Sequence, residues 1–252
     1  NRKTNNLITT LSLPQSTGFD GITTNYGGLR NKGLEFEVKL QLMPKQSELQ
    51  WEFGFNASKV KTNIRKLPNN GLKRNRVGGF YAWDPSKKDY DWVGGLQEGG
   101  RIGDLFAWKQ IGIFATDEEA KNAPIDMMSP YENKTKFGGD VSWKDTDKNG
   151  KIDEKDIVYM GNTYPKWTGG LYNSLKYKNY DLYIRLDYMT GHTIYNYAKM
   201  FLCGRFAGNI NIPQEMIDKG WKKQGDRATR PIYIPDDNYN FWRGSDYHSR
   251  LV

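Results

Sequence analysis

The segment LEFEVKLQL, residues 34–42, alternates strictly between apolar and polar side chains. Successive side chains of a β-strand point to opposite faces, so this pattern predicts a strand with one apolar and one charged face. The segment LQWEFGFNAS follows after a short polar connection and repeats the alternation. These segments predict an antiparallel hairpin with strands at about 34–42 and 49–60.

A second hairpin is predicted within the stretch WTGGLYNSLKYKNYDLYIRLDYM. Its turn is the pair Lys178–Asn179, which separates predicted strands at about 167–177 and 180–190. Asn173 interrupts the apolar series of the first strand, which therefore has the weaker pattern of the two.

Long connections separate these elements, at about 61–166 and 191–247, and both are far longer than ordinary loops. Within the first, DLFAWKQIGIF is compatible with a strand, and TDEEAKNA predicts a short helix capped by Thr116 with Glu119 three residues later. Short turns at one end of the strands and long connections at the other are typical of outer-membrane barrels with long extracellular loops.

The chain is therefore expected to be all-β, and two architectures fit the alternation. One is a segment of an antiparallel transmembrane β-barrel, and the other is a soluble β-sandwich with decorated loops. The charged face of the strands, which would point into the barrel, favours the first. About five strands of membrane-crossing length are visible, whereas the smallest barrels need 8. The sequence therefore predicts a piece of a longer polypeptide. It contains no run of ~18 apolar residues that would predict a transmembrane helix.

Composition argues against several function classes. The net charge is +8, but the basic residues form no run and no recognition motif accompanies them, so nucleic acid is not an expected partner. The single cysteine, Cys203, allows no disulfide within the chain. A secreted carbohydrate-active enzyme would need paired carboxylates converging in a cleft, and no pair stands out. The chain is therefore not expected to be an enzyme.

The segment DTDKNGKIDEKD, residues 145–156, has the ligand spacing of a calcium-binding loop. Oxygens at alternate positions bring several hard ligands to one cation, and Gly150 permits the sharp turn. The loop departs from the EF-hand pattern by having Asp at position twelve and no flanking helix pattern. It predicts a structural Ca²⁺ site, and the competing interpretation is a solvated Asx-rich turn. The predicted ligands are Asp145, Asp147, Asn149, Lys151 through its carbonyl, Asp153 through water, and Asp156.

Several stretches together resemble a known family. They are, in chain order, GGLRNKGLEFEV, IGDLFAWKQIGIFATDEEA, GGDVSWKDTDKNGKIDEKDIVYMGNTYPKWTGGL and FWRGSDYHSRLV. Together they resemble the C-terminal half of SusC/RagA-type TonB-linked outer-membrane proteins of Bacteroidetes, over nearly the whole chain. The resemblance implies part of a 22-stranded barrel in the cell outer membrane, capped by a SusD-like surface lipoprotein. The plug domain and the segment that contacts TonB belong to the family's N-terminal half, which this chain lacks.

The function implied by this resemblance is TonB-dependent import of oligosaccharides or peptides. Calcium would stiffen an extracellular loop against which the capping partner closes, so Asp147→Ala is expected to loosen that loop without unfolding the strands. The alternative function is that of a soluble, calcium-stabilised β-sandwich that binds glycan at a cell surface.

Aromatic residues of the long connections are candidate contacts for a ligand or partner, because flat rings stack on sugar faces and anchor interfaces. Packing within the loops would explain any single ring. Trp51 and the tyrosines beside Lys178–Asn179 fit an interfacial girdle in contact with outer-membrane lipid. The candidate contacts are Tyr81, Trp83, Tyr90, Trp92, Tyr239, Phe241 and Trp242.

Overall fold

The structure is a computed structural model of the chain, and it describes residues 1–12, 17–18, 20–129, 134–204 and 211–233. The chain divides into two compact units. We call them the sheet unit, comprising Asn1–Gly78, Gly95–Asp104 and Asn162–Thr193, and the loop unit, comprising Gly79–Gly94, Leu105–Gly161 and Ile194–Val252.

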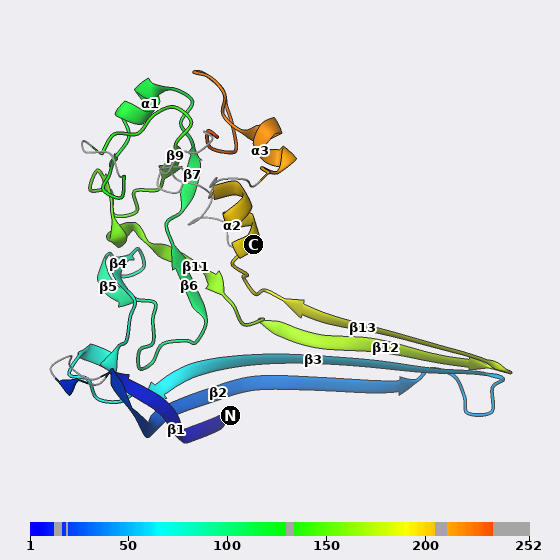
Figure 1. Cartoon of the computed structure of the whole chain (residues 1–252). Helices are drawn as coiled ribbons and strands as arrows, with labels where there is room; N and C mark the ends of the chain where they lie inside the picture. Colours follow the sequence, from blue (N-terminus) through cyan, green and yellow to red (C-terminus); the bar gives the residue numbers. More distant parts are fainter. Residues whose placement is uncertain (13–16, 19, 130–133, 205–210, 234–252) are drawn as a thin grey trace. The chain divides into compact units, whose positions relative to one another are not determined.

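The sheet unit is built on one antiparallel sheet with the strand order β1-β2-β3-β12-β13 (Figure 1). Both predicted hairpins are present, and β12 runs without a break through Asn173. The strands are β1 (Arg2–Ser12), β2 (Gly21–Gln41), β3 (Leu49–Lys66), β12 (Trp167–Tyr177) and β13 (Tyr180–Thr190).

The first hairpin is longer than its alternating pattern predicts. β2 begins at Gly21 rather than near residue 34, and β3 continues to Lys66 rather than ending near residue 60. Residues 28–33 of β2 pair with the end of β3, for example Asn31 with Thr62, and residues 21–27 pair with β1. Backbone hydrogen bonding therefore extends the strands where the side-chain pattern has ended.

The pairing register separates apolar from polar side chains. Phe36 lies opposite Ala57, and Leu171 lies opposite both Phe55 and Leu186, so these side chains share one face. That face is uncovered in the described part of the chain, and Leu186 is 58% exposed. We call it the apolar face; it carries Leu34, Phe36, Val38, Leu40, Trp51, Phe53, Phe55, Ala57, Trp167, Leu171, Asn173, Leu175, Tyr177, Tyr180, Leu182, Ile184, Leu186 and Tyr188.

The opposite face, which we call the polar face, carries mainly charged and hydrogen-bonding side chains. Ion pairs join residues two apart on the same strand: Lys39 with Glu37 at 3.0 Å, and Arg185 with Asp187 at 3.0 Å. All four side chains are exposed, so these pairs contribute little to stability.

Tyrosine rings cover two glycines of the sheet. On the polar face the ring of Tyr172 crosses Gly54, where a Cβ atom would collide with it, and the Tyr172 hydroxyl donates to Glu52 at 2.6 Å. On the apolar face Tyr188 covers Gly169, where a Cβ would lie 2.7 Å from the tyrosine oxygen. Each ring reaches from its own strand over the neighbouring strand.

The first long connection, between β3 and β12, contains short paired strands. The stretch expected to be one strand is divided into β6 and β7, which pair with different partners. The antiparallel pairs are β4 (Phe80–Asp84) with β5 (Asp89–Val93), and β7 (Gln110–Ile113) with β9 (Val141–Trp143). The others are β6 (Asp104–Ala107) with β11 (Val158–Asn162), and β8 (Ile125–Asp126) with β10 (Lys151–Ile152) in parallel.

The helices are short, and no described helix is both long and apolar enough to cross a membrane. The predicted helix near residue 117 is confirmed: Thr116 caps it by accepting the Glu119 amide at 3.1 Å, and the Glu119 carboxylate accepts the Ala115 amide at 2.8 Å. The helices are η2 (Lys73–Asn75), α1 (Asp117–Lys121), η3 (Glu154–Asp156), α2 (Tyr197–Gly204) and α3 (Gln214–Lys219).

The loop unit has a small core and a buried ion pair. Val141, Trp143 and Ile152 pack together, which ties β9 to β10. Lys136 lies 2.8 Å from Asp126, and the two side chains are 4% and 2% exposed. Loss of either partner would leave the other charge buried, so this pair helps to define how the segments assemble.

Candidate metal and ligand-contact sites

The acidic loop, residues 145–156, brings carboxylates from its start and its end together. One carboxylate oxygen from each of Asp145, Asp147 and Asp156 lies within 4.8 Å of the others. Gly150 has φ +79°, in the left-handed region that glycine adopts readily, and its amide donates to Asp145 Oδ2 at 2.8 Å. The loop therefore folds back on itself as its spacing predicts.

Asp156 is the buried member of this cluster. Its side chain accepts the Thr146 amide at 2.6 Å and the Asp153 amide at 2.9 Å. Burial raises the pKa of Asp156, although these two backbone donors oppose the shift. A cation beside the three carboxylates would favour the charged form that burial disfavours.

The other predicted ligands have different partners. Asn149 uses its side-chain oxygen to accept the Lys151 amide at 2.8 Å and its amide nitrogen to donate to Asp147 at 2.8 Å. Asp153 caps η3 by accepting the Lys155 amide at 2.7 Å. The structure therefore assembles Asp145, Asp147 and Asp156 as one group and uses Asn149 and Asp153 to shape the loop.

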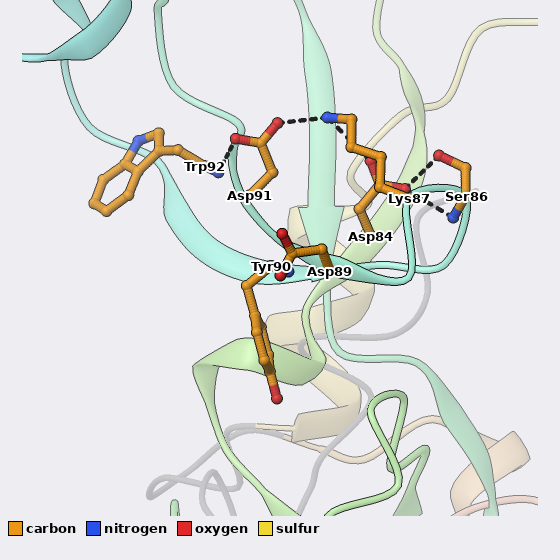
Figure 2. A network of polar contacts seen from close by, with 7 residues as sticks. All are labelled: Asp84, Ser86, Lys87, Asp89, Tyr90, Asp91 and Trp92. Atoms are coloured by element: carbon orange, nitrogen blue, oxygen red, sulfur yellow. Dashed lines mark hydrogen bonds and ion pairs between the residues drawn. The ribbon is translucent and has the colours of Figure 1, made fainter.

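The β4–β5 hairpin has a tightly bonded turn, drawn in Figure 2. Lys87 lies 3.3 Å from Asp84 and 2.5 Å from Asp91, which joins the two strands beside the turn. The Ser86 hydroxyl and amide both donate to Asp84 Oδ1, and the hydroxyl contributes most to lowering the pKa of Asp84. These contacts connect the turn residues Ser86 and Lys87 to the ends of both strands.

The hairpin gathers the aromatic residues that the sequence singled out between residues 81 and 92. Tyr81 lies opposite Trp92 and Trp83 lies opposite Tyr90, so all four side chains lie on one face of the hairpin. Tyr81 stacks on Tyr90 at 5.6 Å between centroids, and Trp83 meets Tyr90 edge-on at 5.2 Å. We call this element the aromatic hairpin. The predicted contacts Tyr239, Phe241 and Trp242 lie outside the described residues.

The aromatic hairpin is bonded to the acidic loop through Tyr90. The Tyr90 hydroxyl donates to Asp147 Oδ2 at 2.6 Å, and the carboxylate raises the pKa of Tyr90 to about 12. The Lys155 ammonium lies 5.5 Å from the centre of the Tyr90 ring. Tyr90 is therefore an anchor, whereas Tyr81, at 50% exposed, presents its ring to solvent.

A charged cluster that the sequence patterns did not predict surrounds Glu215. Arg230, whose side chain is 1% exposed, donates from Nε to Glu215 at 3.0 Å and lowers the pKa of Glu215. Lys199 and Lys219 lie 3.6 and 3.8 Å from the same carboxylate. Only the Glu215–Lys219 contact has a sequence signal, because the two residues are four apart in a helix.

Comparison with curated proteins confirms the resemblance to TonB-dependent receptors. TonB-dependent receptor P3 of Formosa agariphila is 28% identical over 217 residues, covering 86% of this chain and 20% of the receptor. TonB-dependent receptor P39 of the same organism is 23% identical over 262 residues, covering 91% of this chain and 23% of the receptor. The chain therefore spans about a fifth of the length of the curated relatives it matches. No protein-family model matches the chain.

The fold is similar to solved structures of the RagAB peptide transporter. One aligns with a TM-score of 0.60 at 16% identity, covering 91% of this chain and 23% of that chain. The RagAB peptide importer in its 'closed-closed' state also aligns with a TM-score of 0.60, at 14% identity and over 93% of this chain. The antiparallel sheet and its attached loop segments thus have a counterpart in a solved transporter chain.

Proposed function

We propose that this chain forms part of the wall of a TonB-dependent importer in the cell outer membrane. The observation that carries the proposal is the uncovered apolar face, which lies opposite a charged polar face on the same strands. An apolar surface of this extent is unfavourable in water but is satisfied by lipid, while the polar face suits a barrel interior. Closure of a 22-stranded barrel needs strands beyond those in this chain.

The dimensions of β12 support contact with a bilayer. Its apolar-face residues end in aromatic rings, Trp167 at one end and Tyr177 at the other. A rise of ~3.3 Å per residue and a strand tilt of ~40° give about 25 Å between them, the height of the apolar band of outer-membrane barrels. Lys59 lies 5.2 Å from the Trp167 ring and Lys178 lies 5.1 Å from the Tyr177 ring. Such paired rings and cations suit the two membrane interfaces.

The proposed cargo is an oligosaccharide or a peptide, and the proposed partners are a SusD-like surface lipoprotein and TonB. The RagAB structures that share this fold are described as a peptide transporter and importer, and they support transport rather than catalysis. A soluble glycan-binding sandwich would need a second layer over the apolar face, and no described residues supply one.

The membrane proposal is tested by cysteine labelling of adjacent residues on opposite faces. In the intact protein, with Cys203 replaced by serine, we expect Leu186→Cys to be protected from a water-soluble maleimide while the protein is in the membrane. Asp187→Cys, one residue along β13, is the matched control and is expected to react. Equal labelling of both positions in membranes would contradict contact between the apolar face and lipid.

The acidic loop is proposed to bind Ca²⁺ in a structural role. The proposal is supported by the convergence of Asp145, Asp147 and Asp156, because calcium takes several oxygen ligands from a flexible loop. In the intact protein, Ca²⁺ is expected to slow proteolysis within residues 145–156, and Asp147→Ala is expected to abolish this protection. Asp218→Asn, in α3, controls for the loss of one acidic charge. Cleavage that is the same with and without Ca²⁺ in the wild type would exclude the site.

The aromatic hairpin is proposed to contact ligand or the capping partner through its exposed ring, Tyr81. The support is that the hairpin has an aromatic face on which the Tyr81 ring is half exposed, and that Lys87 links the two strands of the hairpin beside the turn. Tyr81→Ala is expected to weaken capture of cargo or of the partner by the intact importer, whereas Tyr159→Ala, another half-exposed tyrosine, controls for loss of a surface ring.

A further inference from the structure

The apolar face becomes basic just beyond its Trp167 end. The register places Lys59 opposite Leu34, Lys61 opposite Lys32, and Lys3 opposite Arg30. Residues two apart on a strand share a face, so these side chains continue the face of Leu34 and Trp167. We call this group the basic strip; it consists of Lys3, Arg30, Lys32, Lys59 and Lys61.

Like charges oppose one another directly in the basic strip. Lys32 with Lys61, and Lys3 with Arg30, are cross-strand partners, and directly opposed like charges destabilise a sheet. Glu35, the nearest carboxylate along β2, belongs to the polar face because it follows Leu34 by one residue. None of the five cations forms an ion pair with a carboxylate in the described part of the chain. The sheet therefore holds a concentration of positive charge that it does not neutralise.

The opposite end of the apolar face lacks this excess. There Tyr177 is followed by Lys178, and the Lys178 ammonium lies 3.9 Å from the Glu48 carboxylate. The basic strip is thus a property of one boundary of the apolar face. If a bilayer covers that face, only one leaflet meets the unneutralised cations.

We propose that the basic strip binds the phosphate groups of anionic lipid headgroups. This inference rests on the proposed contact between the apolar face and a bilayer, because headgroups lie directly beyond the hydrocarbon boundary. Lys59 is placed at that boundary, with its ammonium over the Trp167 ring. Lysine stems can lie along lipid while their ammonium groups reach the headgroup level.

The shape of the basic strip favours a lipid surface over a free anion. Its cations are distributed over three strands and successive register positions, and four of the five are exposed lysines. A single phosphate ion would contact only a few of them at once, whereas neighbouring headgroups can contact the whole strip. Each lysine near an anionic membrane surface strengthens binding by about fivefold.

The test uses the intact protein in non-ionic detergent and counts bound lipid by native mass spectrometry. Phosphatidylglycerol is the anionic probe, and phosphatidylcholine is the probe of zero net charge. Wild type is expected to prefer phosphatidylglycerol, and the double variant Lys32→Gln with Lys61→Gln is expected to bind it roughly 30-fold more weakly. The matched control is Lys45→Gln with Lys176→Gln, which removes the same charge away from the strip and is expected to bind as wild type does.

Two outcomes would overturn the inference. One is equal binding of phosphatidylglycerol by wild type and the Lys32/Lys61 variant. The other is displacement of the lipid by inorganic phosphate at equal concentration, which would indicate a site for free anions. The labelling of Leu186→Cys separates this inference from the proposal on which it rests. If Leu186→Cys is protected in membranes and the lysine variant still binds normally, only the basic strip is refuted.

Discussion

Trp51 donates its indole N–H to the side-chain oxygen of Asn173 across the apolar face, at 3.1 Å. Asn173 is the polar interruption in β12, and Trp51 lies on the neighbouring β3, where its direct register partner is Leu175. The bond is therefore diagonal, and it satisfies an oxygen that would be costly to bury in an apolar environment. The polar side chain that interrupts the apolar pattern of β12 thus has a hydrogen-bond donor on the same face.

Trp51→Phe is expected to destabilise the intact protein by about 1–3 kcal/mol, because it removes the donor and leaves the Asn173 oxygen unsatisfied against lipid. Asn173→Leu in the same background is expected to restore most of that stability, since replacing both partners by apolar groups removes the unsatisfied atom. Denaturant unfolding of the single and double variants in liposomes measures both effects. Purely additive losses would contradict the coupling.

Gly54→Ala is expected to cost about 1–3 kcal/mol, because the added Cβ collides with the ring of Tyr172 and forces it away from Glu52. Gly112→Ala is the control, since a Cβ there meets no atom within 4 Å, and it is expected to stay within ~0.5 kcal/mol of wild type. Unfolding of the intact protein in denaturant compares them. A Gly54→Ala variant as stable as Gly112→Ala would show that the ring is not fixed over the glycine.

Tyr90→Phe is expected to loosen the aromatic hairpin from the acidic loop, because it removes the hydroxyl that donates to Asp147 and keeps the stacked ring. Faster amide exchange in residues 80–93 of the intact protein is the measurement. Tyr81→Phe removes a hydroxyl from the adjacent ring without breaking the bond to Asp147, and it is expected to exchange as wild type does. The idea fails if the two variants exchange alike.

Glu215→Gln is expected to lower the free energy that protects the α3 amides from hydrogen exchange by about 2–3 kcal/mol at neutral pH. The reason is that the buried Arg230 loses a charged acceptor. Arg230 lowers the pKa of Glu215, so the bond stabilises the fold above the ordinary glutamate value of 4.5 and is lost as pH falls through the lowered pKa. Wild type should therefore approach the variant in acid. Hydrogen exchange of α3 against pH tests this, with Asp218→Asn as control.

Alternation was sufficient to predict the two hairpins, β2–β3 and β12–β13, but it predicted neither β1 nor the full length of β2 and β3. In LEFEVKLQL, apolar and polar side chains alternate, so the sequence itself shows the two faces of the strand. Residues 21–33 also belong to β2, but they are held there by backbone pairing and have no alternating apolar pattern. The loop unit also contains buried contacts such as Lys136 with Asp126, and the sequence carries no local pattern that predicts them.

The acidic loop was predictable in part for a related reason. The spacing of the ligands depends only on the local course of one loop. It was therefore sufficient to predict that Asp145, Asp147 and Asp156 lie close together. It could not show that Asp153 would instead cap η3, since both uses need the same carboxylate. The hydrogen bond from Tyr90 to Asp147 joins residues that are 57 apart in the chain, and no sequence pattern near either residue predicts the contact.

The two tyrosines that cover glycines also restrict which strand alignments are possible. A slip of β12 by one residue against β3 would turn Tyr172 to the apolar face, and a slip by two would place its ring over Glu52 or Asn56 instead of Gly54. Tyr188 imposes a similar condition between β13 and β12 on the other side of the sheet. The two rings, on opposite faces, thus favour a single alignment at each of two neighbouring strand pairs, β3 with β12 and β12 with β13.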